Sequence, residues 1–337
     1  MKAPLQIAVI GAGIAGKSHL LDAVTTPDVA VRAVCAEHMP SAESAAHDFG
    51  IARAYADFEV LLRRETLQGI IVATPPNVLQ FQTLMALKRG LTVLAEKPLA
   101  TQMRCLEKMA FAGRDRPFPV CVAYPRRYRK VWRQARAWLA AGKIGRIESI
   151  HAHWQSPYRE WYGPATATFR KSPRRSVGGA FLDTGCHILD AVLFLTGTLG
   201  EPHAVSMEPN DNGLDIGIEV SGKQPCGADL CIEMVDSVQE EKTMQVTGAK
   251  GMIAIKDERA TLVTGHESIA IQDEYVARPI DDMTRLYQGV APLGALIPDA
   301  AAVTRFLLRA YAIAGAPLRH NWTEPRGKAL SRLNGGC

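Results

Sequence analysis

The chain has 337 residues, of which 47% are hydrophobic and 22% are charged, and its formal net charge is +5. This length is typical of two domains or one large one, with enough apolar material for a sizeable core. The basic excess is small and scattered. Its densest run, residues 126–133, is more typical of a solvated amphipathic helix than of a nucleic-acid patch, so we expect no nucleic-acid partner.

The seven cysteines indicate neither a metal centre nor a disulfide framework. No two have the CxxC spacing of a zinc or redox motif, and their number is odd. Reduced thiols in a cytoplasmic protein therefore fit best, and no metal is expected. The N-terminus leads straight into a strand pattern without a signal peptide, and we expect no contact with a membrane.

A glycine-rich turn follows the first predicted strand. Residues 5–10 form a short, mostly apolar run with β-branched residues, residues 11–16 read GAGIAG, and a helical stretch covers 17–24. A GxGxxG motif between a strand and a helix is the context of a dinucleotide-binding fingerprint. The helix N-terminus then favours the phosphates. The residues predicted to contact the cofactor here are Gly11, Gly13, Ile14 and Ala15.

Glu37 follows the second predicted strand, residues 29–35, and lies 21 residues after Gly16. A carboxylate at this point can accept hydrogen bonds from the adenosine ribose, and it would repel a 2′-phosphate. Residues 38–41 contain no arginine or lysine. The sequence therefore favours NAD over NADP, although a solvated loop carboxylate is the alternative interpretation.

Further apolar strands, at 69–73, 91–95 and 120–124, alternate with helical stretches at 41–49, 58–64 and 78–88. This alternation predicts a doubly wound parallel sheet, which we assign to a dinucleotide-binding domain of residues 1–124. Ligands bind beyond the carboxyl ends of such strands. Thr74 and Asn77 are therefore predicted to contact the cofactor, and Lys97 is predicted to point into the cleft and to contact the cofactor there.

The pattern changes after residue 124. A helix is predicted at 126–141 and a final one at 298–314, and short strands dominate between them. We predict that residues 125–337 form a substrate-binding and oligomerisation domain on a mostly antiparallel sheet. The predicted strands cover 147–154, 203–207, 229–234, 243–247, 252–256, 260–263 and 268–271.

The stretch GGAFLDTGCHILD, residues 178–190, carries the strongest chemical signal. Asp183, His187 and Asp190 are four and three residues apart, which places them on one face of a helix. A carboxylate one turn before an imidazole can orient it and tune its pKa. A buried core histidine with Asp183 as a helix cap is the alternative. The preceding loop, 155–177, carries Tyr158 and Trp161, whose rings could cover the apolar face of a sugar.

Together these motifs resemble the Gfo/Idh/MocA oxidoreductases. The resemblance covers nearly the whole chain and rests on the following motifs: GAGIAG at 11–16, ATPPN at 73–77, AEKPLA at 95–100, RRY at 126–128, Phe169-Arg170 and residues 178–190. It implies NAD(P)-dependent oxidation or reduction of a sugar or polyol by a homodimer or homotetramer that associates through the C-terminal sheet. It also implies that Lys97, Asp183 and His187 are catalytic, that Glu96 and Asn77 lie on the cofactor side, and that Arg170 lies near the substrate. We further expect Arg127, Tyr158 and Trp161 to bind the substrate.

The sequence departs from the family pattern at Leu79, Pro125 and Lys130, where many members have histidine, asparagine and proline. The substrate therefore cannot be taken from one relative. Our leading hypothesis is an NAD-dependent dehydrogenase in which His187 is the general base, Lys97 stabilises developing alkoxide charge and Asp183 orients the pair or the substrate. The alternatives are NAD-assisted glycoside cleavage or epimerisation with a recycled cofactor, and a non-catalytic NAD sensor.

Overall fold

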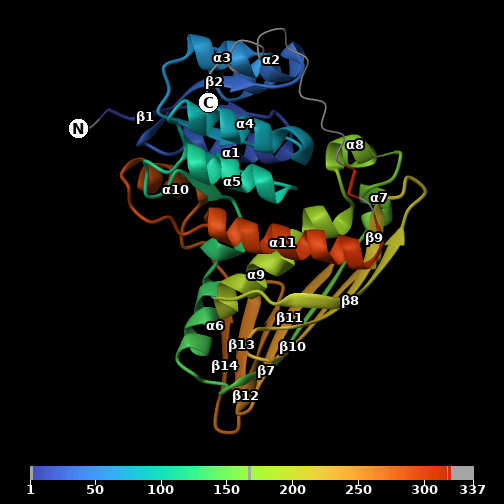
Figure 1. The fold of residues 1–337 in the computed structure, drawn as a ribbon. Coiled ribbons are helices and arrows are strands. Elements are labelled where there is room, and N and C mark those ends of the chain that lie inside the picture. The colour runs from blue at the N-terminus through green and yellow to red at the C-terminus, as the bar shows by residue number, and fades with distance from the viewer. Residues whose placement is uncertain (1–2, 166–167, 317, 320–337) are drawn as a thin grey trace.

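The computed structural model describes residues 3–165, 168–316 and 318–319. Its N-terminal half, at the top of Figure 1, is built on a six-stranded sheet. The strand order is β3-β2-β1-β4-β5-β6, and every pair of neighbours is parallel. The strands are β1 (Leu5–Ile10), β2 (Val29–Cys35), β3 (Ala54–Tyr55), β4 (Gly69–Val72), β5 (Thr92–Ala95) and β6 (Val120–Val122).

Helices cover both faces of this sheet because its strands are apolar on both sides. In β1, Ile7 and Val9 pack with one group of helices, and Ala8 and Ile10 pack with the other. The doubly wound parallel sheet is thus confirmed. Its own helices are α1 (Ile14–Val24), α2 (Met39–Asp48), α3 (Phe58–Arg64), α4 (Pro76–Lys88) and α5 (Met103–Ala112).

The second sheet has eight strands in the order β14-β13-β12-β11-β7-β10-β9-β8 and is antiparallel except between β7 and β10. The mostly antiparallel sheet is therefore confirmed too. Its strands are β7 (Ile147–Ser156), β8 (Glu201–Pro209), β9 (Asp215–Lys223), β10 (Asp229–Asp236), β11 (Glu241–Gly248), β12 (Gly251–Lys256), β13 (Arg259–Thr264) and β14 (Ser268–Gln272).

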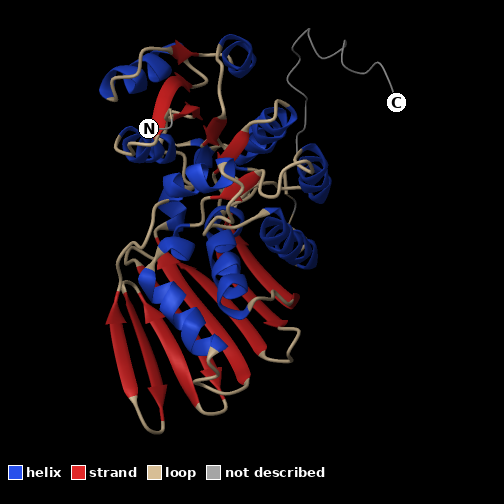
Figure 2. Ribbon diagram, turned by 90° about the vertical axis from the view of Figure 1, so that its left-hand side faces the viewer, coloured by secondary structure: helices blue, strands red, loops and turns tan. Residues whose placement is uncertain are grey.

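Helices lie against one face of this second sheet (Figure 2). On the other face, the alternate residues of the central strands β7 and β10 are exposed or half-buried. The helical elements of this half are η1 (Pro125–Tyr128), α6 (Lys130–Ala140), α7 (Tyr158–Trp161), η2 (Phe169–Lys171), α8 (Pro173–Ser176), η3 (Phe181–Gly185), α9 (Cys186–Thr196), α10 (Pro279–Tyr287) and α11 (Ile297–Ile313). Association of copies through this sheet stays a prediction.

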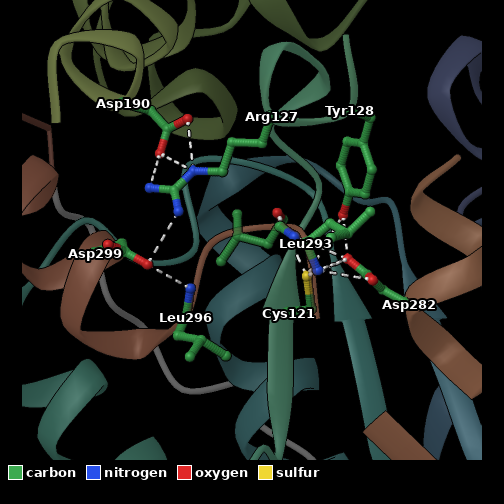
Figure 3. Close-up of polar contacts among 10 residues, drawn as sticks. Cys121, Arg127, Tyr128, Asp190, Asp282, Leu293, Leu296 and Asp299 are labelled. Atoms are coloured by element: carbon green, nitrogen blue, oxygen red, sulfur yellow. Dashed lines mark hydrogen bonds and ion pairs between the residues drawn. The ribbon is translucent and has the colours of Figure 1, made fainter. Parts of the chain in front are cut away.

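Helix α10 returns from the second half to the first sheet. Ile280, Met283 and Leu286 share one core cluster with residues of β1, β4 and β5. The carboxylate of Asp282 accepts hydrogen bonds from the hydroxyl of Tyr128 at 2.7 Å and from the backbone N–H of Leu293 at 2.9 Å (Figure 3). The first core is therefore completed by residues far along the chain.

Several local features differ from the sequence-based expectations. Strand β9 and helix α10 are present where neither was predicted, and the loop at 155–177 contains the short helices α7, η2 and α8. The expected regular helix at residues 181–190 begins as a π-helical turn, η3. One helical stretch, Pro173–Thr196, is long and apolar enough to cross a membrane by length and composition alone, and 94% of its apolar 18-residue segment is buried inside the molecule.

Candidate active site

The glycine turn after β1 has the geometry that a bound pyrophosphate requires. Gly11 has φ +107°, and a Cβ at this residue would lie 2.1 Å from the carbonyl oxygen of Ala73. Gly13 precedes α1 and faces open space, since a Cβ there would meet nothing within 4 Å. No side chain caps the N-terminus of α1, and Ile14 beside it is 82% exposed. The first backbone N–H groups of α1 are therefore available to bind an anion.

Glu37 lies just beyond β2 as predicted, but it has a partner that the sequence did not indicate. Its carboxylate accepts a hydrogen bond at 2.7 Å from the guanidinium of Arg175, which belongs to α8. The two residues are 138 positions apart, so inspection of the residues next to Glu37 could not reveal this cation. A basic group thus lies beside the carboxylate that is predicted to meet the ribose.

The turn after β4 presents one unsatisfied polar side chain. The amide oxygen Oδ1 of Asn77 is buried and has no hydrogen-bond partner among the described residues. The hydroxyl of Thr74 donates to the side-chain oxygen of Gln82 at 2.6 Å, so it is already engaged. Of these two predicted cofactor contacts, Asn77 has a buried oxygen that lacks a partner among the described residues, and the hydroxyl oxygen of Thr74 can still accept a hydrogen bond.

Glu96 and Lys97 follow β5 at the same edge of the sheet. One carboxylate oxygen of Glu96 lies 2.9 Å from Nε2 of His19 in α1, and the other accepts from the backbone N–H of Lys97 at 3.2 Å. Burial opposes ionisation of Glu96, but the hydrogen bond from His19 and the charge of Lys97 lower its pKa. Glu96 therefore links the helix of the glycine turn to the lysine, and His19 is a contact that the sequence reasoning missed.

Lys97 and Asp183 form the centre of the site. The Lys97 ammonium donates to the carboxylate Oδ1 of Asp183 and, at 2.9 Å, to its backbone carbonyl oxygen. The other carboxylate oxygen accepts from Nε of Arg170 at 2.6 Å and from the hydroxyl of Tyr162 at 2.9 Å. The structure thus brings the predicted Lys97, Asp183 and Arg170 together, and adds Tyr162.

The charges in this cluster support one another. Burial alone would raise the pKa of Asp183, but the cations of Lys97 and Arg170 hold it far below its usual range. Burial opposes the charge on Lys97, yet the neighbouring carboxylate of Asp183 raises the pKa of the lysine. Lys97 is therefore an ammonium hydrogen-bond donor at neutral pH, and Asp183 is ionised.

His187 lies one turn after Asp183, with its ring edge-on to that of Tyr124 at a centroid distance of 5.8 Å. Its Nδ1 is buried and has no hydrogen-bond partner among the described residues. Burial and the positive charges of Lys97 and Arg126 lower the pKa of His187 well below 6.5. The imidazole is therefore neutral at pH 7 and able to accept a proton.

Arg126 is a further cation in this region that the sequence reasoning did not single out. Its guanidinium stacks on the ring of Trp154 at 4.1 Å, and no hydrogen bond joins it to another described residue. Burial lowers its pKa to about 10.

The two aromatic residues predicted to bind the substrate lie side by side. Tyr158 is fully buried with its ring edge-on to that of Trp161 at a centroid distance of 5.6 Å, and the ring of Trp161 lies 5.7 Å from the guanidinium of Arg170.

Arg127, predicted to bind substrate, is engaged elsewhere (Figure 3). Its guanidinium donates to Asp190 at 2.7 and 3.0 Å and to Asp299 at 3.3 Å, and its side chain is only 8% exposed. Asp190 is thus directed away from the cluster of Asp183. We reassign Arg127 and Asp190 to a buried ion network that joins η1, α9 and α11.

Taken together, the residues present fit a dinucleotide. Gly13 leaves room for the pyrophosphate, the N–H groups at the start of α1 are uncapped, and the buried oxygen of Asn77 lacks a donor. These features belong to two turns, after β1 and after β4, at the carboxyl edge of one parallel sheet, which is where such cofactors bind.

Comparison with known families agrees with this geometry. Residues 5–124 match the profile described as "Oxidoreductase family, NAD-binding Rossmann fold", and residues 132–254 match the "GFO/IDH/MocA C-terminal domain". The chain belongs to the Gfo/Idh/MocA oxidoreductase family. The profile that matches the N-terminal residues is described as NAD-binding, in agreement with the glycine turn after β1.

Individual relatives of this Gfo/Idh/MocA protein are distant. D-glucoside 3-dehydrogenase of Escherichia coli K12 is 28% identical over 58% of this chain and 54% of its own length. Levoglucosan dehydrogenase of Pseudarthrobacter phenanthrenivorans is 28% identical over 60% and 53%. The chain thus spans about half the length of these two relatives. The crystal structure of GenD2 from gentamicin A biosynthesis, in complex with NAD, has a TM-score of 0.80 at 20% identity over 94% of this chain and 95% of its own, which shows the shared fold.

Proposed function

We propose that this protein is an NAD-dependent dehydrogenase that oxidises a secondary hydroxyl, or an anomeric carbon, of a sugar, inositol or related polyol, or catalyses the reverse reduction. The observation that carries this proposal is the arrangement of an ammonium donor and a neutral imidazole beside the cofactor turn. Lys97 is held by Asp183, and Glu96 connects it to His19 of α1. The sugar substrates named for the two curated relatives support the substrate class.

The protonation states divide the work between the two side chains. His187 is neutral and can remove the proton of the reacting hydroxyl. Lys97 keeps its proton, so it orients that hydroxyl and stabilises the negative charge that develops on the oxygen. The nicotinamide, when bound, supplies the hydride-accepting or hydride-donating chemistry. Asp183, fixed by Tyr162 and Arg170, keeps Lys97 in place.

Glu37 supports NAD rather than NADP as the cofactor. Its exposed carboxylate can accept hydrogen bonds from the ribose hydroxyls, and it would repel a 2′-phosphate. Arg175 partly offsets this repulsion because its guanidinium lies 2.7 Å from the same carboxylate. The preference for NAD is therefore a balance between two side chains of opposite charge.

The direct test is nicotinamide reduction across a panel of sugars, glycosides, inositols and polyols, measured with NAD and NADP in parallel. We expect at least one substrate that turns over with NAD and poorly with NADP. No turnover on the whole panel, with tight NAD binding shown by calorimetry, would contradict the dehydrogenase proposal. Product analysis by NMR would then separate the two alternatives, since a recycled cofactor gives a cleaved or epimerised sugar and a sensor gives none.

A further inference from the structure

We infer that strands β7 and β10 carry a divalent metal site of the zinc class on the open face of the large sheet, remote in sequence from the glycine turn. The site consists of His151, Cys231 and Glu233 as ligands and His153 as a supporting residue. The CxxC spacing that usually signals such a site is absent, because its ligands come from two different strands. The inference does not depend on the proposed dehydrogenase function.

The register of the two strands places these side chains together. Strands β7 and β10 are parallel neighbours, with Cys231 opposite His151 and Glu233 opposite His153. Residues two apart on a strand point to the same face. Because Ile150, Ala152 and Trp154 are buried against the helices, His151 and His153 must point to the other face. All four side chains therefore share one small area that is exposed or half-buried.

The distances already approach those of a coordination sphere. The ligand atoms of His151, Cys231 and Glu233 all lie within 4.8 Å of one another, and Nε2 of His151 is 3.3 Å from a carboxylate oxygen of Glu233. Metal–nitrogen and metal–oxygen bonds of about 2.0–2.2 Å give a tetrahedral edge of roughly 3.3–3.5 Å. The thiol of Cys231 would have to approach by only about 1 Å to complete the set.

The surroundings of Glu233 favour a cation. Nδ1 of His153 lies 2.9 Å from the same carboxylate oxygen that His151 approaches, so His153 can fix the orientation of Glu233. Supporting hydrogen bonds of this kind tune metal ligands in general. On the next strand, β9, the exposed Glu219 lies directly opposite Glu233 and adds a second negative charge.

The donor set selects the metal. One thiol, one imidazole and one carboxylate suit zinc, and they are unsuited to magnesium or calcium, which require oxygen ligands. Three protein ligands leave a fourth position open to water or to another ligand. The chain thus provides an exposed three-ligand site of the zinc type.

The test is a zinc titration of the metal-stripped full-length protein against a chromophoric chelator, with Cys226 and Cys337 both replaced by serine to remove other candidate thiols. We expect one zinc ion per chain, lost in Cys231→Ser and in His151→Ala. His153→Ala should weaken binding about 10- to 100-fold without abolishing it. His266→Ala, which removes another exposed histidine, is the matched control and should bind as the parent does.

Cobalt(II) provides a second readout that depends on the thiolate. We expect thiolate-to-cobalt charge-transfer absorption and intense d–d bands in the parent protein, and loss of the charge-transfer band in Cys231→Ser. Thermal unfolding of each variant verifies that it is folded. Failure of the parent to bind zinc, equal binding by the parent and both ligand variants, or a cobalt spectrum without the thiolate band would overturn the inference.

Discussion

At the scale of single residues, Lys97 is the side chain whose role is most sharply defined, because its charge is held by Asp183. Replacing Lys97 by methionine removes the ammonium and keeps most of the side-chain volume. We expect kcat to fall about 100-fold or more, with a smaller change in KM, because the lost interaction acts mainly in the transition state. Steady-state kinetics measure this effect. The exposed Lys108→Met is the control, and an unchanged kcat in Lys97→Met would refute the assignment.

The pKa of His187 sets the pH dependence. A general base must be unprotonated, and burial together with the charges of Lys97 and Arg126 lowers the pKa of His187 well below 6.5. We therefore expect kcat/KM for oxidation to stay nearly constant as the pH falls from about 8 to about 6.5, and to decrease only at lower pH. A pH–rate profile measures this. A decrease with a midpoint near 6.5 would show that His187 has its ordinary pKa, or that another group is the base.

The ion pair of Glu37 and Arg175 predicts how cofactor choice can be changed. In Glu37→Gln the repulsive carboxylate is gone and Arg175 loses its partner, so we expect kcat/KM with NADP to rise about 10-fold or more. The double variant Glu37→Gln, Arg175→Gln should lose most of this gain, because the 2′-phosphate then has no cation. Kinetics with both cofactors measure the effect, and an equal gain in the single and double variants would exclude Arg175.

Site residues could be predicted where they belong to a recognisable local motif. The contacts between residues far apart in the sequence could not. The EKP turn and the spacing of Asp183 and His187 indicated a site, and the structure brings Lys97 to Asp183 across 86 residues. Arg175 beside Glu37 and Tyr162 beside Asp183 follow only from the tertiary fold. Arg127 is the opposite case, since it was expected to bind the substrate and the structure shows its guanidinium held by the buried carboxylate of Asp190.

At the scale of elements, the helix that carries Asp183 and His187 is positioned by one buried carboxylate. Asp215 of β9 accepts hydrogen bonds from the backbone N–H groups of Gly179 and Phe181 at 2.9 and 2.7 Å, and from the hydroxyl of Tyr311 at 2.6 Å. A Cβ on Gly179 would lie 2.2 Å from the backbone oxygen of Asp215. The glycine pair was predicted as a sharp turn, but the close approach of β9 is what requires Gly179.

The spacing argument for this helix fails at its first turn. Residues four and three apart share a face only when the helix is regular, and η3 is a π-helical turn that rotates Asp183 relative to Asp190. Asp183 therefore reaches Lys97 while Asp190 reaches Arg127. Strand β9, in contrast, was predictable: Ile216, Ile218 and Val220 alternate with less buried residues, which is the period of a half-buried strand.

A substitution at Tyr311 tests how much the hydrogen bonds around the Asp215 carboxylate contribute to stability. In Tyr311→Phe the hydroxyl that donates to Asp215 and accepts from the N–H of Leu182 is removed. We expect the free energy of unfolding to fall by about 2 kcal/mol, because buried polar groups lose a partner. Denaturant unfolding measures it. Tyr287→Phe, at a half-exposed tyrosine, should change the value by no more than about 0.5 kcal/mol. Equal losses of unfolding free energy in both variants would contradict a stabilising role of the hydrogen bond between Tyr311 and Asp215.

At the scale of the whole molecule, the two sheets were predictable from the change in strand pattern near residue 124, but their mutual dependence was not. Both sheets appear in the expected order and class, because the spacing of apolar residues that indicates strands and helices is a local property of the sequence. The return of α10 is a long-range contact, in which Met283 packs with Ile71 and Leu94 of the first sheet. Asp282 adds hydrogen bonds to Tyr128 and Leu293, so the joint between the halves is polar as well as apolar.

This mutual dependence predicts how the protein unfolds. Because α10 completes the first core and Arg127 joins three elements of the second half, we expect a single cooperative transition in calorimetry. NAD at about 100 times its Kd should stabilise the whole protein by about 2.7 kcal/mol. For 337 residues, an unfolding entropy of about 2.1 cal/mol/K per residue converts this into a rise in Tm of about 4 °C. Two separate transitions, of which NAD raises the Tm of only one, would show that the halves unfold independently and that α10 does not couple them.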